Sequence, residues 1–220
     1  TWPMSPTLSG PLKDVRVRRA LSMAIDREGI AKGLTFGTGV PTCQPFPPGY
    51  AIHIAEVPCT YDPAGAKKLL AEAGYPDGLK LDFVLLNTPE YTAMTEAVQA
   101  NLKAVGITMN ITTIDVAQFG RFVSGKLGDF MMGRWGGRPD PLTTLQILTG
   151  PGGTYTPGGT IGPEYEALLR AAANIEAGNP EREKALRTAA EYSARNMANF
   201  NIVTRVAIYA YGQNCIKGLV

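Results

Sequence analysis

Residues 129–141 read DFMMGRWGGRPDP, and this order predicts a strand, a glycine loop and the start of a helix in direct succession. The opening apolar run is typical of a short buried strand. Gly136 and Gly137 follow, and glycines allow the backbone to turn sharply or to approach a ligand closely. Asp140 is then placed as a helix N-cap, with Pro141 at the first helical position. Open α/β sheets bind ligands beyond the carboxyl ends of their strands, at junctions of this kind.

The side chains of this segment suit ligand binding and contain no nucleophile–base pair. A tryptophan can stack on an organic group, and arginine and aspartate can pair with a charge. For Trp135, ligand contact and ordinary core packing are both open interpretations. Arg134 points to the opposite face from Trp135 if the strand continues that far, so it is the weaker candidate. We predict a ligand-binding site that contains no catalytic residue. The residues expected to form it are Trp135, Gly136, Gly137, Arg138, Asp140 and Arg134.

Composition indicates a globular chain and argues against several classes of partner. The chain has 220 residues, 45% of them hydrophobic, which suffices for one large domain or a domain with an extension. The net charge of +2 does not indicate nucleic-acid binding. No apolar run has the length of a membrane span, and no signal-peptide pattern opens the chain. Because the sequence begins at Thr1, we expect a processed protein or an excised piece.

The cysteines and the one histidine do not predict a metal site. Cys43, Cys59 and Cys215 show no CxxC spacing, and His53 is the only histidine, so a zinc ligand set is not available. Cys43 and Cys59 lie sixteen positions apart in one proline-rich loop. A disulfide between them and two free thiols both remain open.

The sequence on either side predicts an α/β fold in which a mixed sheet is flanked by helices. Residues 81–86 and 107–114 are typical of strands, and a helix capped at Thr88-Pro89 lies between them. Such a βαβ unit has parallel strands and a right-handed connection. The run 200–211 predicts a final strand. Further helices are expected after Asp14 and Asp62, through 119–123, over 142–148, and on both sides of the break at 178–180.

A basic cluster surrounds the helix that Asp14 caps. Lys13, Arg16, Arg18 and Arg19 lie mostly away from its apolar face. Nearby acidic residues balance these charges, so we interpret the cluster as a solvated helix face rather than a phosphate-binding surface.

The residue inventory argues against an enzyme. A Ser-His-Asp triad would need a nucleophile motif such as GxSxG, which does not occur, and the sole histidine lies in a loop. Glu164 and Glu166 could form a carboxylate pair, but we expect both on the solvent face of a helix.

Several stretches are similar to one family across nearly the whole chain. Residues 11–21 and 24–27 resemble the first conserved segment of the family 5 extracellular solute-binding proteins, the dipeptide-, oligopeptide- and nickel-type receptors of ABC importers. Residues 61–76 resemble a second signature and residues 102–107 a third. Trp135-Gly136-Gly137 with Pro139-Asp140-Pro141 matches a fourth.

The resemblance implies a receptor with two lobes, of which this chain is the C-terminal one. It implies an entry segment over 1–12, the lobe itself over 13–199, and a strand and tail over 200–220 leading back towards the first lobe. The implied ligand is a peptide-like or other small organic solute, and the implied partners are the membrane permease subunits of an importer. The implied location is periplasmic or extracellular, at the membrane through the transporter, with no cofactor and no nucleic acid.

One position departs from the family pattern. Peptide-binding members often carry an aspartate three residues after this tryptophan, where it pairs with the peptide amino group. Arg138 stands there instead, and it would repel an amino terminus and favour an anionic or carbonyl-rich group. A shifted register would make Asp140 the acidic group, but that residue also matches the helix start.

A second function remains open for the whole chain. The alternative to a receptor of an importer is a ligand-sensing domain of a transcription regulator.

Overall fold

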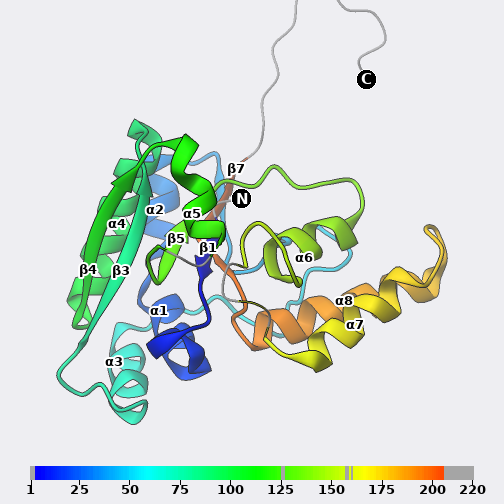
Figure 1. The fold of residues 1–220 in the computed structure, drawn as a ribbon, viewed down its shortest axis with the longest axis horizontal. Coiled ribbons are helices and arrows are strands. Elements are labelled where there is room, and N and C mark those ends of the chain that lie inside the picture. The colour runs from blue at the N-terminus through cyan, green and yellow to red at the C-terminus, as the bar shows by residue number, and fades with distance from the viewer. Residues whose placement is uncertain (1–2, 125–126, 157–158, 160, 206–220) are drawn as a thin grey trace, which may run out of the picture.

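The computed structural model describes residues 3–124, 127–156, 159 and 161–205. Figure 1 shows an α/β body built on a sheet, with a group of helices beside it. The helices are α1 Val15–Ala24, α2 Arg27–Leu34, α3 Pro63–Glu72, α4 Pro89–Ala104, α5 Phe119–Val123, α6 Pro141–Thr149, α7 Pro163–Ala173 and α8 Pro180–Arg195. The strands are β1 Pro3–Pro6, β2 Gly39–Pro41, β3 Leu79–Leu86, β4 Ile107–Ile114, β5 Phe130–Met132, β6 Phe200–Asn201 and β7 Val203–Arg205, and short 3-10 turns cover Gly10–Lys13 and Val116–Gln118.

The main sheet is mixed, as the sequence predicts. Its strand order is β4-β3-β5-β1-β6. Strand β3 pairs in parallel with β4 and with β5, which confirms the βαβ unit. Strand β1 lies between β5 and β6 and is antiparallel to both, so the proline-rich entry segment supplies a strand inside the sheet.

Each face of the sheet is covered by apolar side chains from different helices. On one face, α4 packs Met94, Val98 and Leu102 into the large core that also includes Phe83 and Phe130. On the other face, a smaller cluster gathers around Phe122 of α5, with buried side chains of β3, β4 and β5: Val84, Leu86, Ile114 and Met131. The alternation along β3 and β5 therefore points successive side chains into two separate cores.

Helix starts follow the capping residues that the sequence shows. The side chains of Asp14, Asp62, Thr88 and Asp140 each accept a hydrogen bond from a backbone N–H in the first turn of the helix that follows. These contacts satisfy N–H groups that have no partner inside a helix. The predicted positions of α1, α3, α4 and α6 are confirmed.

The prediction of a solvated basic face on α1 is wrong for Arg18. Lys13, Arg16 and Arg19 are exposed, but Arg18 is only 4% exposed. Its guanidinium donates to the carbonyl oxygens of Leu12, Lys13, Asn196 and Met197, at 2.7–3.0 Å. Arg18 thus joins α1 to the turn after α8, a contact between segments far apart in sequence.

The prediction of one long final strand is also wrong where the structure describes it. Strand β6 belongs to the main sheet, whereas β7 pairs with β2 in a separate two-stranded sheet. Between them the carbonyl of Ile202 accepts from the backbone N–H of Thr42, so the chain changes partners at this residue. Residues 206–211 of the predicted strand lie outside the described residues.

The long loop between β2 and α3 is tied down by covalent and polar contacts. Cys43 and Cys59 form a disulfide. The Gln44 amide group donates to the carbonyls of Ile54 and Val57 and accepts from the N–H of Ile54. Polar side chains therefore satisfy the backbone of a loop that has little regular structure.

Candidate functional site

The loop of residues 133–140 joins β5 to α6 at the carboxyl ends of β3 and β5. Figure 1 shows this loop leaving the sheet and crossing to the helix group. Both of its ends are fixed. At the start, the N–H of Gly133 donates to the carbonyl of Pro3, and at the end Asp140 caps α6. We call residues 133–140 the site loop.

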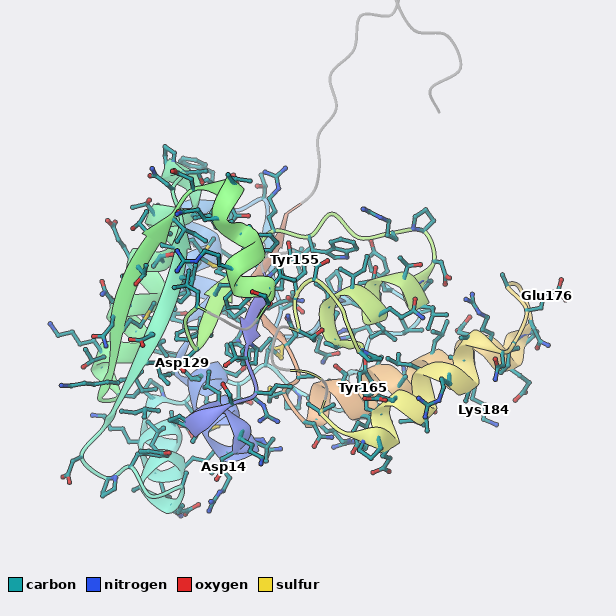
Figure 2. The ribbon with its side chains drawn as sticks, viewed as in Figure 1. Asp14, Asp129, Tyr155, Tyr165, Glu176 and Lys184 are labelled. Carbon is teal, nitrogen blue, oxygen red and sulfur yellow. A yellow bond between two sulfur atoms is a disulfide. The ribbon has the colours of Figure 1, made fainter. Side chains whose placement is uncertain are left out.

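Tyr155, which follows α6 in the sequence, contacts the first two residues of the site loop. Its hydroxyl donates to the carbonyl oxygen of Arg134 at 2.9 Å, and its ring lies directly against Gly133. A Cβ atom at position 133 would lie 2.1 Å from Cε1 of that ring, so any larger residue there would displace Tyr155. Burial raises the pKa of Tyr155 to about 12, so the phenol stays protonated and remains a donor. In Figure 2, Tyr155 lies between the strands and α6.

The side chain of Trp135 is buried against other residues of this chain. Its side chain is 9% exposed and forms a small cluster with Leu148 and Tyr155. The Tyr155 ring meets it edge to face, with 6.4 Å between centroids. Its indole N–H donates to the hydroxyl of Thr144 on α6 at 3.3 Å. Trp135 is therefore oriented before any ligand arrives.

Arg138 lies over the face of Trp135. The guanidinium carbon is 4.5 Å from the ring centroid, a cation–π arrangement. One of its N–H groups donates to the carbonyl of Gly137 at 2.8 Å. Gly137 has φ of +77°, a conformation that favours glycine, whereas a Cβ atom on Gly136 would meet open space. Arg138 is exposed, so the loop presents its cation on an aromatic platform.

Asp140 and Arg134 are separated from this stack. Asp140 accepts from the N–H of Leu142 and also from both terminal nitrogens of Arg182, at 3.1 and 2.9 Å. The Arg182 hydrogen bonds lower the pKa of Asp140, and the capping bond adds to this effect. Arg134 pairs with Glu90 on α4, at 3.4 Å. The site loop thus brings Trp135 and Arg138 together, whereas the carboxylate of Asp140 accepts hydrogen bonds from Leu142 and Arg182 of the same chain.

Sequence reasoning missed Tyr155 and Arg182. Tyr155 lies in a stretch that composition marks only as a loop, and Arg182 is one of several charges at the start of a helix. Neither residue has a local motif that indicates its contact with a loop 21 or 42 positions away.

The described residues give no sign of a metal centre or of a bilayer-spanning helix. Within them, no three side chains of His, Cys, Asp or Glu are grouped so that they could hold a metal ion. Nor does that part of the chain contain a helix both long and apolar enough to cross a bilayer. Two cavities, of about 350 and 410 Å³, lie beside α7 and beside the start of α8; neither is lined by Trp135 or Arg138, but the second is lined by Pro141 and Arg182.

A mixed α/β sheet with a preformed aromatic and cationic loop at its strand ends is typical of a small-molecule binding domain. The chain belongs to the bacterial extracellular solute-binding proteins, family 5, whose middle-region model matches residues 3–156.

Curated relatives and solved structures agree with this assignment. The chain is 31% identical to heme-binding protein A of Haemophilus influenzae in an alignment of 225 positions, gaps included, that covers 97% of this chain and 40% of that protein. It is 34% identical to the dipeptide-binding protein of Escherichia coli in an alignment of 140 positions that covers 60% of this chain and 26% of that one. The structure of HbpA2 from Haemophilus parasuis superposes with a TM-score of 0.84 at 26% identity, covering 93% of this chain and 42% of the other. The chain thus spans less than half the length of these relatives.

Proposed function

We propose that this chain is one lobe of the substrate-binding component of an ABC importer. It would bind a peptide-like or other small organic solute between two lobes. The observation that carries the proposal is the stack of Arg138 on Trp135 at the carboxyl ends of the strands. Relatives named as dipeptide-, glutathione- and heme-binding proteins support a binding role. The same relatives give no support to a transcription regulator.

The exposure of Trp135 and Arg138 supports different roles for them in the proposed site. Trp135 is largely buried, whereas Arg138 is exposed, so a ligand would meet the guanidinium first. Trp135 would then act mainly as the platform that holds Arg138. An arginine has five N–H donors, and the bond to Gly137 uses one, so donors remain for a carboxylate or carbonyl oxygens.

The ligand chemistry follows from the charge at this position. A guanidinium holds a carboxylate or phosphate through two parallel hydrogen bonds. Closure of a second lobe would exclude water and strengthen that pairing. We therefore infer that the preferred ligand places an anionic or carbonyl-rich group on Arg138. Gly136 and Gly137 would keep the backbone beside it free of side chains.

The remaining parts of the proposal follow from the family. The partners would be the permease subunits of the importer, and the location would be periplasmic or extracellular, at the membrane through those subunits. Binding would need no catalysis, cofactor or nucleic acid. A single lobe would supply only part of the ligand contacts, because hinge closure encloses the ligand between two.

Titration calorimetry on the full-length receptor tests the proposal. The panel would contain glutathione, an acidic dipeptide, and the same two peptides with their carboxylates converted to amides. We expect the free acids to bind at least about tenfold more tightly than the amides, the factor that 1.4 kcal/mol gives. Equal affinity of acids and amides would remove the anion-binding role. Rapid chemical turnover of a bound peptide would contradict a binding protein.

A further inference from the structure

Arg182, in the first turn of α8, makes an ion pair unlike the others among the described residues. Its side chain is 13% exposed, whereas the arginine and lysine side chains of the other ion pairs are 40–80% exposed. Both of its terminal nitrogens donate to the Asp140 carboxylate, one to each oxygen. Paired hydrogen bonds of this kind fix direction as well as distance, and partial burial limits their screening by solvent.

Asp140 connects this ion pair to the site loop. The same carboxylate that accepts from Arg182 also accepts from the N–H of Leu142. Pro139 and Pro141 flank it and restrict the backbone on both sides. Arg182 therefore fixes the point where the site loop ends and α6 begins.

Helix α6 carries the contacts that place Trp135. Thr144 accepts from the indole N–H, and Leu148 packs in the same cluster as the indole ring. Arg138 in turn lies on that ring. A shift of α6 would therefore move Trp135 and, with it, the guanidinium.

The middle of the site loop, at Gly136 and Gly137, has few contacts with the rest of the chain. A Cβ atom at Gly136 or Gly137 would meet no other atom within 4 Å, so the chain does not crowd this part of the loop. The fixed points are Tyr155 and β5 at one end, and Asp140 with α6 at the other. Loss of one end would leave more conformations to be ordered when a ligand binds, which lowers affinity.

We propose that Arg182 is a positioning residue for the ligand site. Through Asp140 and α6, it holds Trp135 and Arg138 in the geometry that receives the ligand. The proposal rests on the proposed function, since it assigns a role in the same site. It adds a residue on α8 that lies 44 positions after Arg138 in sequence and forms no part of the stack.

The test uses four variants of the full-length protein: Arg182→Gln, Asp140→Asn, the double variant, and Arg195→Gln as control. Asparagine remains a good N-cap, so Asp140→Asn keeps the cap and removes the charge that Arg182 holds. Arg195 lies on the same helix in an exposed pair with Glu191, so its replacement removes an ion pair that does not contact the site loop. Hydrogen exchange of the Trp135 indole N–H, assigned by its loss in Trp135→Phe, reports loop position without a ligand. Calorimetry with glutathione reports affinity.

We expect Arg182→Gln and Asp140→Asn each to speed indole exchange and to weaken glutathione binding, both by about tenfold, equivalent to 1.4 kcal/mol. The double variant should match the single variants, because each removes the same pair. Arg195→Gln should behave as the unmodified protein. Unchanged indole exchange in Arg182→Gln, or additive effects in the double variant, would overturn the positioning role.

The two readouts separate this inference from the proposed function. If exchange speeds but glutathione affinity is unchanged, and Arg138→Ala also leaves affinity unchanged, the loop is positioned by Arg182 but is not the ligand site. The assignment of the ligand site to this loop then fails, and the inference fails with it. If Arg138→Ala weakens binding while Arg182→Gln alters neither readout, the proposed function stands and only the positioning role is lost.

Discussion

Two regions of this molecule use arginine in opposite ways. On α1 and at the start of α2, Arg18 and Arg27 are 4% and 3% exposed, and their guanidinium groups bond mainly to backbone carbonyls, including those of Met197 and Asn201. In the site loop, Arg138 is exposed and lies on Trp135. The first pair has its donors occupied inside the protein, whereas Arg138 keeps donors for a partner. The comparison indicates that environment, rather than residue type, separates an arginine that stabilises the fold from one that our proposal assigns to ligand binding.

Burial changes the electrostatics of the two arginines in the first region. It lowers the pKa of Arg18 and of Arg27 to about 10. The ion stays charged at neutral pH because carbonyl dipoles replace its water. Arg27 donates to the carbonyls of Ser22, Ile25 and Asn201 and to the Ser22 hydroxyl. These contacts join the start of α2 to the end of β6.

Replacing Arg27 should give the largest effect on stability. Arg27→Met would leave buried carbonyls of Ser22 and Asn201 without this donor, at a cost of about 3 kcal/mol. Urea unfolding would measure the change. Arg19→Met, an exposed position on α1, is the control and should stay within about 0.5 kcal/mol of the unmodified protein. Equal losses in the two variants would break the contrast between buried and exposed arginines.

Removing the disulfide should have a similar effect on the same region. Asn201 donates its backbone N–H to Cys43, so the bridge braces the segment that Arg27 holds. Cys43→Ser with Cys59→Ser should lower the free energy of unfolding by about 3 kcal/mol in the chain-entropy model. Reductant should reproduce this loss in the unmodified protein and add nothing in the double variant. Full stability after complete reduction would show that the bridge does not brace the loop.

Tyr155→Phe should have a smaller effect, centred on the site loop. The change removes the hydrogen bond to the Arg134 carbonyl and should cost about 1 kcal/mol. Thermal unfolding and the Trp135 indole resonance would both report it. Tyr192→Phe, which removes an exposed hydroxyl bonded to Glu164, is the matched control. A shifted Trp135 resonance in the control alone would count against Tyr155 as the holder of the loop.

The pair of Arg182 and Asp140 should give the smallest effect on stability, and that effect should depend on pH. Arg182 lowers the folded-state pKa of Asp140 below its ordinary 3.8, so the stabilisation is present above that value and is lost as pH falls through the folded pKa. Unfolding measured from pH 7 to pH 2 should therefore show Arg182→Gln approaching the unmodified protein only below about pH 4. A difference that grows as pH falls would contradict this sign.

The sequence was sufficient to predict helices and strands where the contacts that determine them lie within a few residues. Asp14, Asp62, Thr88 and Asp140 cap helices because each side chain reaches an N–H two or three residues ahead. The apolar run of 81–86 and the alternation within 107–114 are also local patterns, and both segments form strands. The parallel pairing then follows from the helix between them.

Contacts between distant segments were not predictable in this way. Arg18 is buried by carbonyls 178 and 179 positions away, which no periodicity on its own helix reveals. Strand β1 lies inside the sheet because β5 and β6 pair with it on both sides. Within the candidate site, the sequence named Trp135 and Arg138 but did not predict that Arg138 stacks on the indole ring. Tyr155 and Arg182 reach the loop only through the folded chain.

The affinity of Arg138 variants for glutathione tests the central claim most directly. In the full-length receptor, Arg138→Ala should weaken binding by about 1.5–3 kcal/mol if a charged hydrogen bond is lost. Arg138→Lys should restore only part of that loss, because lysine keeps the charge without the fork geometry. Arg134→Ala is the control, and it should bind as the unmodified protein does, since Arg134 pairs with Glu90 and takes no part in the stack. Unchanged affinity in both Arg138 variants would remove Arg138 from the site and contradict the account.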